Sequence, residues 1–223
     1  GAAIPLHFDR AVRERLTALC RELGITEFML LQTAVAVVLS KAGGGHDIPL
    51  GTPVAGGAPT PNWTGWSAFF VNILVLRNDL SGNPTLREAL LRAREMALAA
   101  YANQDLPFDR VVDAVNPVRS LSRNPLFQVV VHVREELPEN QLIETGPDGD
   151  TRFTALEPTF DVAHADLSVN FFVGDDGYRG HVIYRTELYQ PSTMERFSGW
   201  LGQVIEAIAA DPDTPGARRR PAR

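Results

Sequence analysis

The stretch Phe127-Gln128-Val129-Val130-Val131-His132-Val133 decides the fold, because phenylalanine or valine fills every second position in it. Strict alternation over seven residues is typical of a β-strand that turns one face to a core. A second stretch, Asp166–Val173, alternates in the same way and places Asp166, Ser168 and Asn170 on one face. On spacing alone these three polar side chains face solvent, and the alternative is a polar cleft. Two such strands predict a sheet that helices cover on one side.

The residues around these two stretches predict five helices and three more strands. Apolar residues at helical spacing, with capping residues or glycines at the ends, predict the helices. Thr26 caps the second of them, which has almost no polar side and is therefore expected to be buried. The expected helices are Asp9–Leu23, Phe28–Ser40, Thr85–Tyr101, a short one after Pro107, and one that carries Met194, Phe197, Leu201, Val204, Ile205 and Ile208 and ends before Asp211; the expected strands are Asp47–Val54, Val71–Arg77 and Gly180–Leu188, the last preceded by a hairpin turn at Gly174–Gly177.

The order of these elements predicts one domain of the α/β (α+β) class. Its architecture is expected to be a two-layer sandwich in which a mixed, partly antiparallel β-sheet packs against helices. The domain is expected to span residues 1–210, and residues 211–223 are expected to form a linker toward a downstream domain. Two stretches rich in proline, glycine or polar residues, 56–61 and 138–150, are expected to be loops.

Composition excludes several classes of protein. The 223 residues are 44% hydrophobic and 22% charged, which is ordinary for a folded globular chain and not for a disordered one. The formal charge of -6 is opposite to that of a general nucleic-acid binder, whose surface carries a basic stripe. The longest apolar run, Phe28–Leu39, falls short of the roughly 20 residues that a membrane helix needs. We therefore expect neither a nucleic-acid partner nor a membrane.

The single cysteine and the five histidines offer little chemistry of their own. Cys20 has no disulfide partner in the chain, which fits a cytoplasmic protein, and it lies on the apolar stripe of its predicted helix. We therefore expect a buried thiol rather than a nucleophile. No phosphate-binding loop or nucleophile elbow occurs, and the histidines lack the spacing of metal-ligand motifs, so neither a metal site nor a catalytic residue is expected; the histidines are His7, His46, His132, His164 and His181.

The most unusual composition lies at residues 63–72, where four large aromatic residues lead into a predicted strand. One interpretation is a loop that its aromatic side chains pin to the core. The other is a loop that lines a channel. Asn72 lies on the strand beside Leu74 and Leu76, so a buried Asn72 side chain must find hydrogen-bond partners in the backbone or in a ligand.

Three segments in one order give the chain a family resemblance: Phe69–Arg77, Asn103–Asp109 and Arg119–Gln128. With their spacing, they resemble the C-terminal lobe of a condensation domain of a non-ribosomal peptide synthetase. Gly51–Gly56 and Tyr184–Leu188 are also similar to that family. The resemblance covers nearly the whole chain, and three motifs in order are far more specific than any one of them.

The resemblance implies a chloramphenicol-acetyltransferase-like lobe and a role in amide bond formation. In that family two similar lobes form a V, and donor and acceptor carrier protein domains deliver aminoacyl or peptidyl thioesters on phosphopantetheine. The implied partners are the N-terminal lobe, these carrier domains and a downstream adenylation domain, and no cofactor is bound directly. The family's catalytic histidine belongs to a His-His-x-x-x-Asp-Gly motif, and no histidine here has a histidine beside it. The chain is therefore expected to be one lobe of the enzyme and inactive alone.

The resemblance also implies roles for two groups of residues. The first group would line the substrate tunnel, with a structural clamp as the alternative for Asn72. The second would cap helices or tie the motif loops together. The tunnel candidates are Trp66, Phe69, Phe70, Asn72, Ser168 and Asn170; the structural candidates are Gln104, Asp105, Pro107, Phe108, Arg119, Arg123, Asn124 and Pro125.

Two positions depart from the family pattern. Gly57 stands where an arginine commonly follows Gly51–Gly56 and pairs with the aspartate of the missing motif. Ala68 stands where glycine is usual. A glycine cannot replace the arginine's charge, so the alternative function is a degenerate, non-catalytic module that binds carrier or partner proteins.

Overall fold

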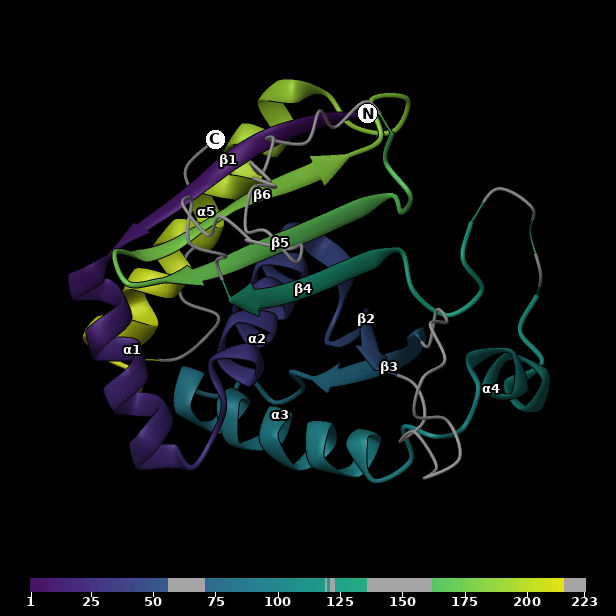
Figure 1. The fold of residues 1–223 in the computed structure, drawn as a ribbon, viewed down its shortest axis with the longest axis horizontal. Helices are drawn as coiled ribbons and strands as arrows, with labels where there is room; N and C mark the ends of the chain where they lie inside the picture. Colours follow the sequence, from purple (N-terminus) through teal and green to yellow (C-terminus); the bar gives the residue numbers. More distant parts are fainter. Residues whose placement is uncertain (56–70, 119, 121–122, 136–161, 215–223) are drawn as a thin grey trace, which may run out of the picture.

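The computed structural model describes residues 1–55, 71–118, 120, 123–135 and 162–214, which form a six-stranded sheet and its helices (Figure 1). The strand order across the sheet is β1-β6-β5-β4-β2-β3. The pairs β2–β4 and β4–β5 are parallel and the other pairs are antiparallel, so the sheet is mixed. The strands are β1 (Ala2–Asp9), β2 (Asp47–Ala55), β3 (Val71–Asp79), β4 (Val129–Glu135), β5 (Leu167–Gly174) and β6 (Gly177–Tyr184).

The helices lie against one face of this sheet, and α2 and α5 are seen behind β4, β5 and β6 in Figure 1. This arrangement confirms the two-layer architecture with a mixed sheet. The helices are α1 (Arg10–Leu23), α2 (Glu27–Leu39), α3 (Leu86–Tyr101), α4 (Phe108–Val115) and α5 (Pro191–Ala210), and a π-helical turn, Ser40–Gly44, follows α2.

Capping residues fix the ends of the helices where the sequence predicts them. The Asp9 carboxylate accepts a hydrogen bond from the amide of Val12, and Gly24 ends α1 with a left-handed φ of 62°. The Thr26 hydroxyl caps α2 in the same way. Thr85 and Glu88 form a reciprocal capping box at the start of α3.

The core lies between the sheet and the helices. Val131, Val169 and Phe171 point from the odd-numbered positions of β4 and β5 into it and are fully buried. Leu30 of α2 and Ile205 of α5 meet them from the helical layer and are equally buried. Burying side chains of this size stabilises the fold by about 1.5–3 kcal/mol each. The apolar positions of the alternating strands thus mark the core face of the sheet.

The prediction for Cys20 is also confirmed. The side chain is 5% exposed among the core residues of α1. Burial raises the pKa of the Cys20 thiol to about 12, and the charge of Glu27 adds to the shift. The thiol therefore stays protonated at neutral pH.

Two strand predictions need correction. β1 is not expected from the sequence, because Pro5 interrupts its short pattern and its partner is the distant strand β6. β6 begins at Gly177 and ends at Tyr184, whereas the sequence predicts Gly180–Leu188. After Tyr184 the chain turns, since the amides of Leu188 and Tyr189 both donate to the carbonyl of Arg185. The hairpin is as predicted, with Gly174 paired to Gly177.

The residues that follow α5 fold back onto α3. The carbonyls of Pro212 and Thr214 accept hydrogen bonds from the amides of Arg87 at 2.7 Å and Leu86 at 3.1 Å. Both amides belong to the first turn of α3, where a helix has no carbonyl of its own for them. The first four residues of the expected linker, 211–214, are therefore hydrogen-bonded to the domain. Its other residues, and the expected loops 56–61 and 138–150, lie outside the described part of the chain.

Candidate functional site

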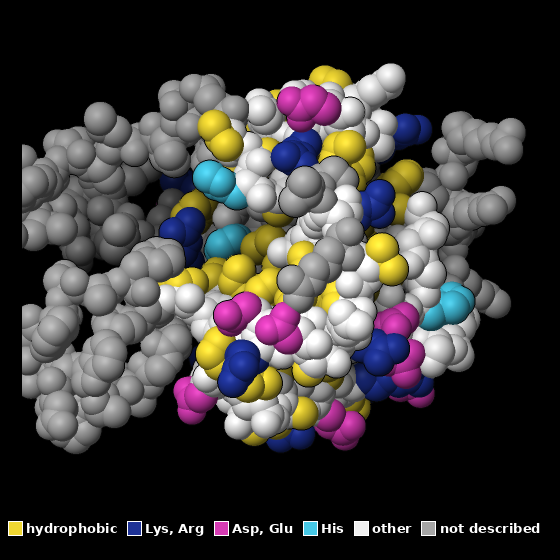
Figure 2. Space-filling model, turned by 90° about the vertical axis from the view of Figure 1, so that its right-hand side faces the viewer, with side chains coloured by type: hydrophobic (Ala, Val, Ile, Leu, Met, Phe, Trp, Pro, Cys, Tyr) yellow, Lys and Arg dark blue, Asp and Glu magenta, His cyan; other side chains and the backbone are white. Residues whose placement is uncertain are grey.

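The sheet face away from the helices carries the even-numbered residues of β4 and β5. Val130 pairs with Ser168 and His132 pairs with Asn170 across the two strands. On the far side of β5, Asn170 pairs with His181 of β6. Figure 2 shows this end of the molecule, where histidine, arginine or lysine, and apolar side chains gather around a hollow.

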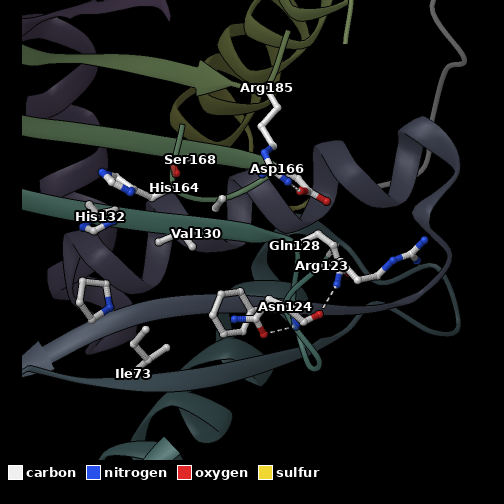
Figure 3. A pocket seen from close by; sticks show the side chains of 13 residues that line it. Ile73, Arg123, Asn124, Gln128, Val130, His132, His164, Asp166, Ser168 and Arg185 are labelled. Carbon is white, nitrogen blue, oxygen red and sulfur yellow. Dashed lines mark hydrogen bonds and ion pairs between the residues drawn. The ribbon is translucent and has the colours of Figure 1, made fainter. Parts of the chain in front are cut away.

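A cavity of about 410 Å³ opens on this face beside the first residues of β4 and β5. Its floor is mostly apolar, and polar side chains approach it from several segments (Figure 3). Figure 3 places Val130 and His132 on one side of the cavity and Ile73 on the other. The polar residues that line it are Arg123, Asn124, Gln128, His132, His164, Asp166, Ser168 and Arg185.

An ion pair holds one rim of this cavity. The guanidinium of Arg185 lies 3.4 Å from a carboxylate oxygen of Asp166, and the Arg185 amide donates to the Asp166 carbonyl at 3.2 Å. The Asp166 side chain is 17% exposed. Arg185 therefore compensates the charge of a largely buried carboxylate, and the pair ties the start of β5 to the end of β6.

His132 stands between this cavity and a second one. Burial lowers the pKa of the His132 imidazole, and the positive charge of Arg134 lowers it further. The imidazole is therefore neutral at physiological pH. A neutral imidazole offers one hydrogen-bond donor and one acceptor, which suits it to a polar uncharged group of a ligand.

The second cavity, of about 380 Å³, opens where β2 and β4 separate. The two strands pair only at Leu50–Val129 and Gly51–Val130. Pro53 and His132 line both cavities, so the two hollows adjoin. Together they extend from the open face of the sheet toward the helical layer, where Phe28 and Tyr101 lie.

The Asn72 side chain joins the first motif segment to the second. Its Nδ2 donates to the carbonyls of Gln104 and Leu106, both at 2.8 Å. Its Oδ1 accepts a hydrogen bond from the amide of Phe108 at 3.1 Å. Both amide hydrogens of Asn72 are thus donated to the segment that starts α4. These are the contacts of a structural clamp, the alternative that the sequence leaves open for this residue.

Aromatic packing joins the second segment to the third. The rings of Phe108 and Phe127 lie with their centroids 5.7 Å apart. A side chain at Gly51 would place its Cβ 2.4 Å from the Phe127 ring, so only glycine leaves room for that ring against β2. The Asn124 side chain accepts hydrogen bonds from the amides of Leu126 and Phe127 and sets the turn before β4. All three motif segments therefore meet at one point beside the cavities.

The predicted site residues divide into three sets. Ser168, Arg123 and Asn124 line the first cavity. Asn170 is 8% exposed beside His132 and His181, so the expectation that it faces solvent is wrong. Asp105 and Pro107 are exposed, Pro125 is half-buried, and Pro107 precedes α4. The predictions for Gly57, Trp66, Ala68, Phe69, Phe70 and Arg119 concern positions outside the described residues.

Sequence reasoning missed five residues of the first cavity: Gln128, His132, His164, Asp166 as an ion-pair partner, and Arg185. The signal for Gln128 and His132 was present, because the same alternation that buries Val129 and Val131 turns them to the other face. His164 and Arg185 lie just outside strands, where no periodic pattern marks them.

The described part of the chain contains no group of three or more histidine, cysteine, aspartate or glutamate side chains arranged to hold a metal ion. Nor does any one helix within that part have the length and apolar character to cross a bilayer. The groups around the cavities are imidazole, guanidinium, hydroxyl and amide. This set binds and orients a polar substrate through hydrogen bonds and charge.

Curated relatives match nearly the whole chain. It is 39% identical over 213 residues to a linear gramicidin synthase from Brevibacillus parabrevis, which covers 95% of this chain and 4% of that synthase. It is 34% identical over 224 residues to the dimodular nonribosomal peptide synthase of Bacillus subtilis, which covers 96% of this chain and 9% of that protein. The chain thus spans a small fraction of the length of the curated relatives it matches.

Solved structures share the fold. The X-domain from teicoplanin biosynthesis superposes with a TM-score of 0.85 at 25% identity, over 99% of this chain and 50% of that one. The X-domain in its complex with OxyB gives a TM-score of 0.83 at 27% identity, over 97% of this chain and 47% of that one. These matches confirm the chloramphenicol-acetyltransferase-like fold. The family model of the condensation domain matches residues 2–219, and the chain therefore belongs to the condensation-domain family of nonribosomal peptide synthetases.

Proposed function

We propose that the chain is the acceptor-side, C-terminal lobe of a condensation domain that forms amide bonds between carrier-bound thioesters. The observation that carries this proposal is the match to the condensation-domain family over residues 2–219, combined with the coverage of about half of each X-domain chain. A single lobe with one sheet and one helical layer accounts for both. The domain boundary at residue 210 stays a prediction.

The reaction needs little acid or base from this lobe. The acceptor amine attacks the donor thioester carbonyl, the carbon–nitrogen bond forms, the carbon–sulfur bond breaks, and the proton of the amine passes to the released thiol. Holding the amine and the thioester in contact accounts for up to about 7–11 kcal/mol of barrier lowering in well-oriented systems. The hydrogen-bonding side chains around the cavities supply such positioning, with Ser168 and Asn170 as wall groups in the proposal.

The proposed partners follow from this role. They are the N-terminal lobe of the same domain, donor and acceptor carrier protein domains, and a downstream adenylation domain. The substrates arrive on the phosphopantetheine of the carriers, so this lobe needs no cofactor of its own. A cytoplasmic location, expected from the single cysteine, stays a prediction.

The test is amide formation by the complete synthetase. Donor and acceptor carriers loaded with amino acids are expected to give a dipeptidyl thioester with the two-lobe domain and none above the no-protein rate with this chain alone. Amide product from the chain alone would contradict the single-lobe assignment. Sequencing upstream of Gly1 is the cheaper check, because the proposal needs an intact His-His-x-x-x-Asp-Gly motif there.

The second candidate is a non-catalytic module that recruits a partner protein. Gly57, in place of the usual arginine, favours it, as does the likeness to the X-domain that forms a complex with OxyB. A two-lobe domain that binds a partner protein but yields no amide, even after Gly57→Arg, would establish this candidate.

A further inference from the structure

The gap between β2 and β4 is built into the backbone of the sheet. After the pairs Leu50–Val129 and Gly51–Val130, the Thr52 hydroxyl donates to the Val131 carbonyl at 3.0 Å. The next residue, Pro53, has no amide hydrogen with which to continue the ladder. The strands therefore separate at a fixed point, and the 380 Å³ cavity lies just beyond it.

The walls of this cavity are apolar at depth and polar at the mouth. Val54 of β2 and Val133 of β4 face each other across the gap, and Phe28 of α2 and Tyr101 of α3 line it from the helical layer. His132 and Arg134 lie where the gap opens on the other face of the sheet. Arg134 is held there over the ring of Phe172, 5.3 Å from its centre. The gap thus presents one charged group, at its mouth.

The charges select against a cationic guest. The described residues that line the gap include no carboxylate, and Arg134 would repel an ammonium group. Burial raises the pKa of the Tyr101 hydroxyl and lowers that of the His132 imidazole, so both are neutral at physiological pH. Burying an unpaired ammonium group is costly. Burying an apolar side chain is favourable by about 25 cal/mol per Å².

We propose that the gap between β2 and β4 receives the side chain of the amino acid on the acceptor thioester and selects apolar or aromatic side chains over cationic ones. The proposal rests on the proposed function. The adjoining cavity, which shares Pro53 and His132 with the gap, leaves room for the rest of the same substrate. A volume of about 380 Å³ lies within the range of small-molecule sites, so it admits a leucine, phenylalanine or tryptophan side chain.

The test uses the complete synthetase with its acceptor carrier loaded with glycine, leucine, phenylalanine or lysine. Leucine and phenylalanine are expected to give a kcat/KM at least 10-fold above that of lysine. Val54→Trp fills the gap and is expected to lower kcat/KM at least 10-fold for phenylalanine and leucine, and far less for glycine. Leu98→Trp is the control, because Leu98 is 49% exposed on α3 and lines neither cavity.

A second variant enlarges the gap. Phe28→Ala removes a wall, so it is expected to raise the rate with a tryptophan acceptor relative to glycine. A melting curve for each variant shows that it is folded. An equal loss with all acceptors in Val54→Trp, or a wild-type preference for lysine, would overturn the pocket. If the wild-type synthetase forms no amide with any acceptor, the proposed function itself fails.

Discussion

Removing the amide of Asn72 leaves three backbone groups without their partner. The carbonyls of Gln104 and Leu106 and the amide of Phe108 lose a hydrogen bond in Asn72→Ala. We expect the free energy of unfolding to fall by about 1–3 kcal/mol, measured by urea denaturation. Asn103→Ala is the matched control, because that exposed side chain donates to one carbonyl, that of Ala99, within its own helical turn. Unchanged stability with slowed turnover of the two-lobe domain would restore the tunnel role instead.

His132 makes stability depend on pH. Its folded pKa is lowered by burial and by Arg134, so below the unfolded value, about 6.5, the unfolded state binds more protons than the folded state. The stability that the neutral imidazole contributes is therefore complete above that value and is lost as the pH falls through and below it. We expect the decrease in unfolding free energy from pH 7.5 to pH 5.5 to be larger in the wild type than in His132→Gln. Parallel curves for the two proteins would contradict this expectation.

At the scale of elements, the turn at residues 211–214 is a cap for α3. Its two carbonyl contacts with Leu86 and Arg87 stabilise the helix by about 1 kcal/mol for each hydrogen bond. A chain that ends at residue 210 is therefore expected to unfold at a lower temperature than one that ends at 214. Asp213→Ala separates the causes, because it removes the exposed ion pair with Arg87 and leaves the carbonyls in place. Equal melting temperatures for the two truncations would show that the turn contributes nothing.

The elements also show what a sequence reveals. α1, α3 and α5 follow from apolar stripes and capping residues, which are local signals. β1 could not be predicted, because its pairing with β6 is decided by residues far along the chain. The same holds for the site: the cavity residues on β4 and β5 follow from alternation, whereas the contact of Asn72 with residues 104–108 and of Phe127 with Gly51 arises only when the chain is folded.

At the scale of the whole molecule, one face of the sheet has no helical cover among the described residues. Ile73 and Val130 are half-buried apolar residues at the cavity on that face. We expect the isolated chain to bind an apolar fluorescent dye, and Ile73→Lys with Val130→Lys to weaken the signal. Val115→Lys is the control, since Val115 is 58% exposed on α4 and lines neither cavity. A dye signal that the control lowers as much as the test variants would place the apolar surface elsewhere.

The pairing of β1 with β6 sets a constraint on the order of folding. Ala2 pairs with Tyr184 and Asp9 with Gly177, so the first strand of the lobe to leave the ribosome finds its neighbour only when most of the lobe has been made. Until then the buried residues of β1, Leu6 and Phe8, have no strand beside them. Contacts so distant along the chain slow folding, because the entropy of loop closure must be lost before they form. During synthesis this nascent edge is the part of the molecule that a chaperone has most reason to protect.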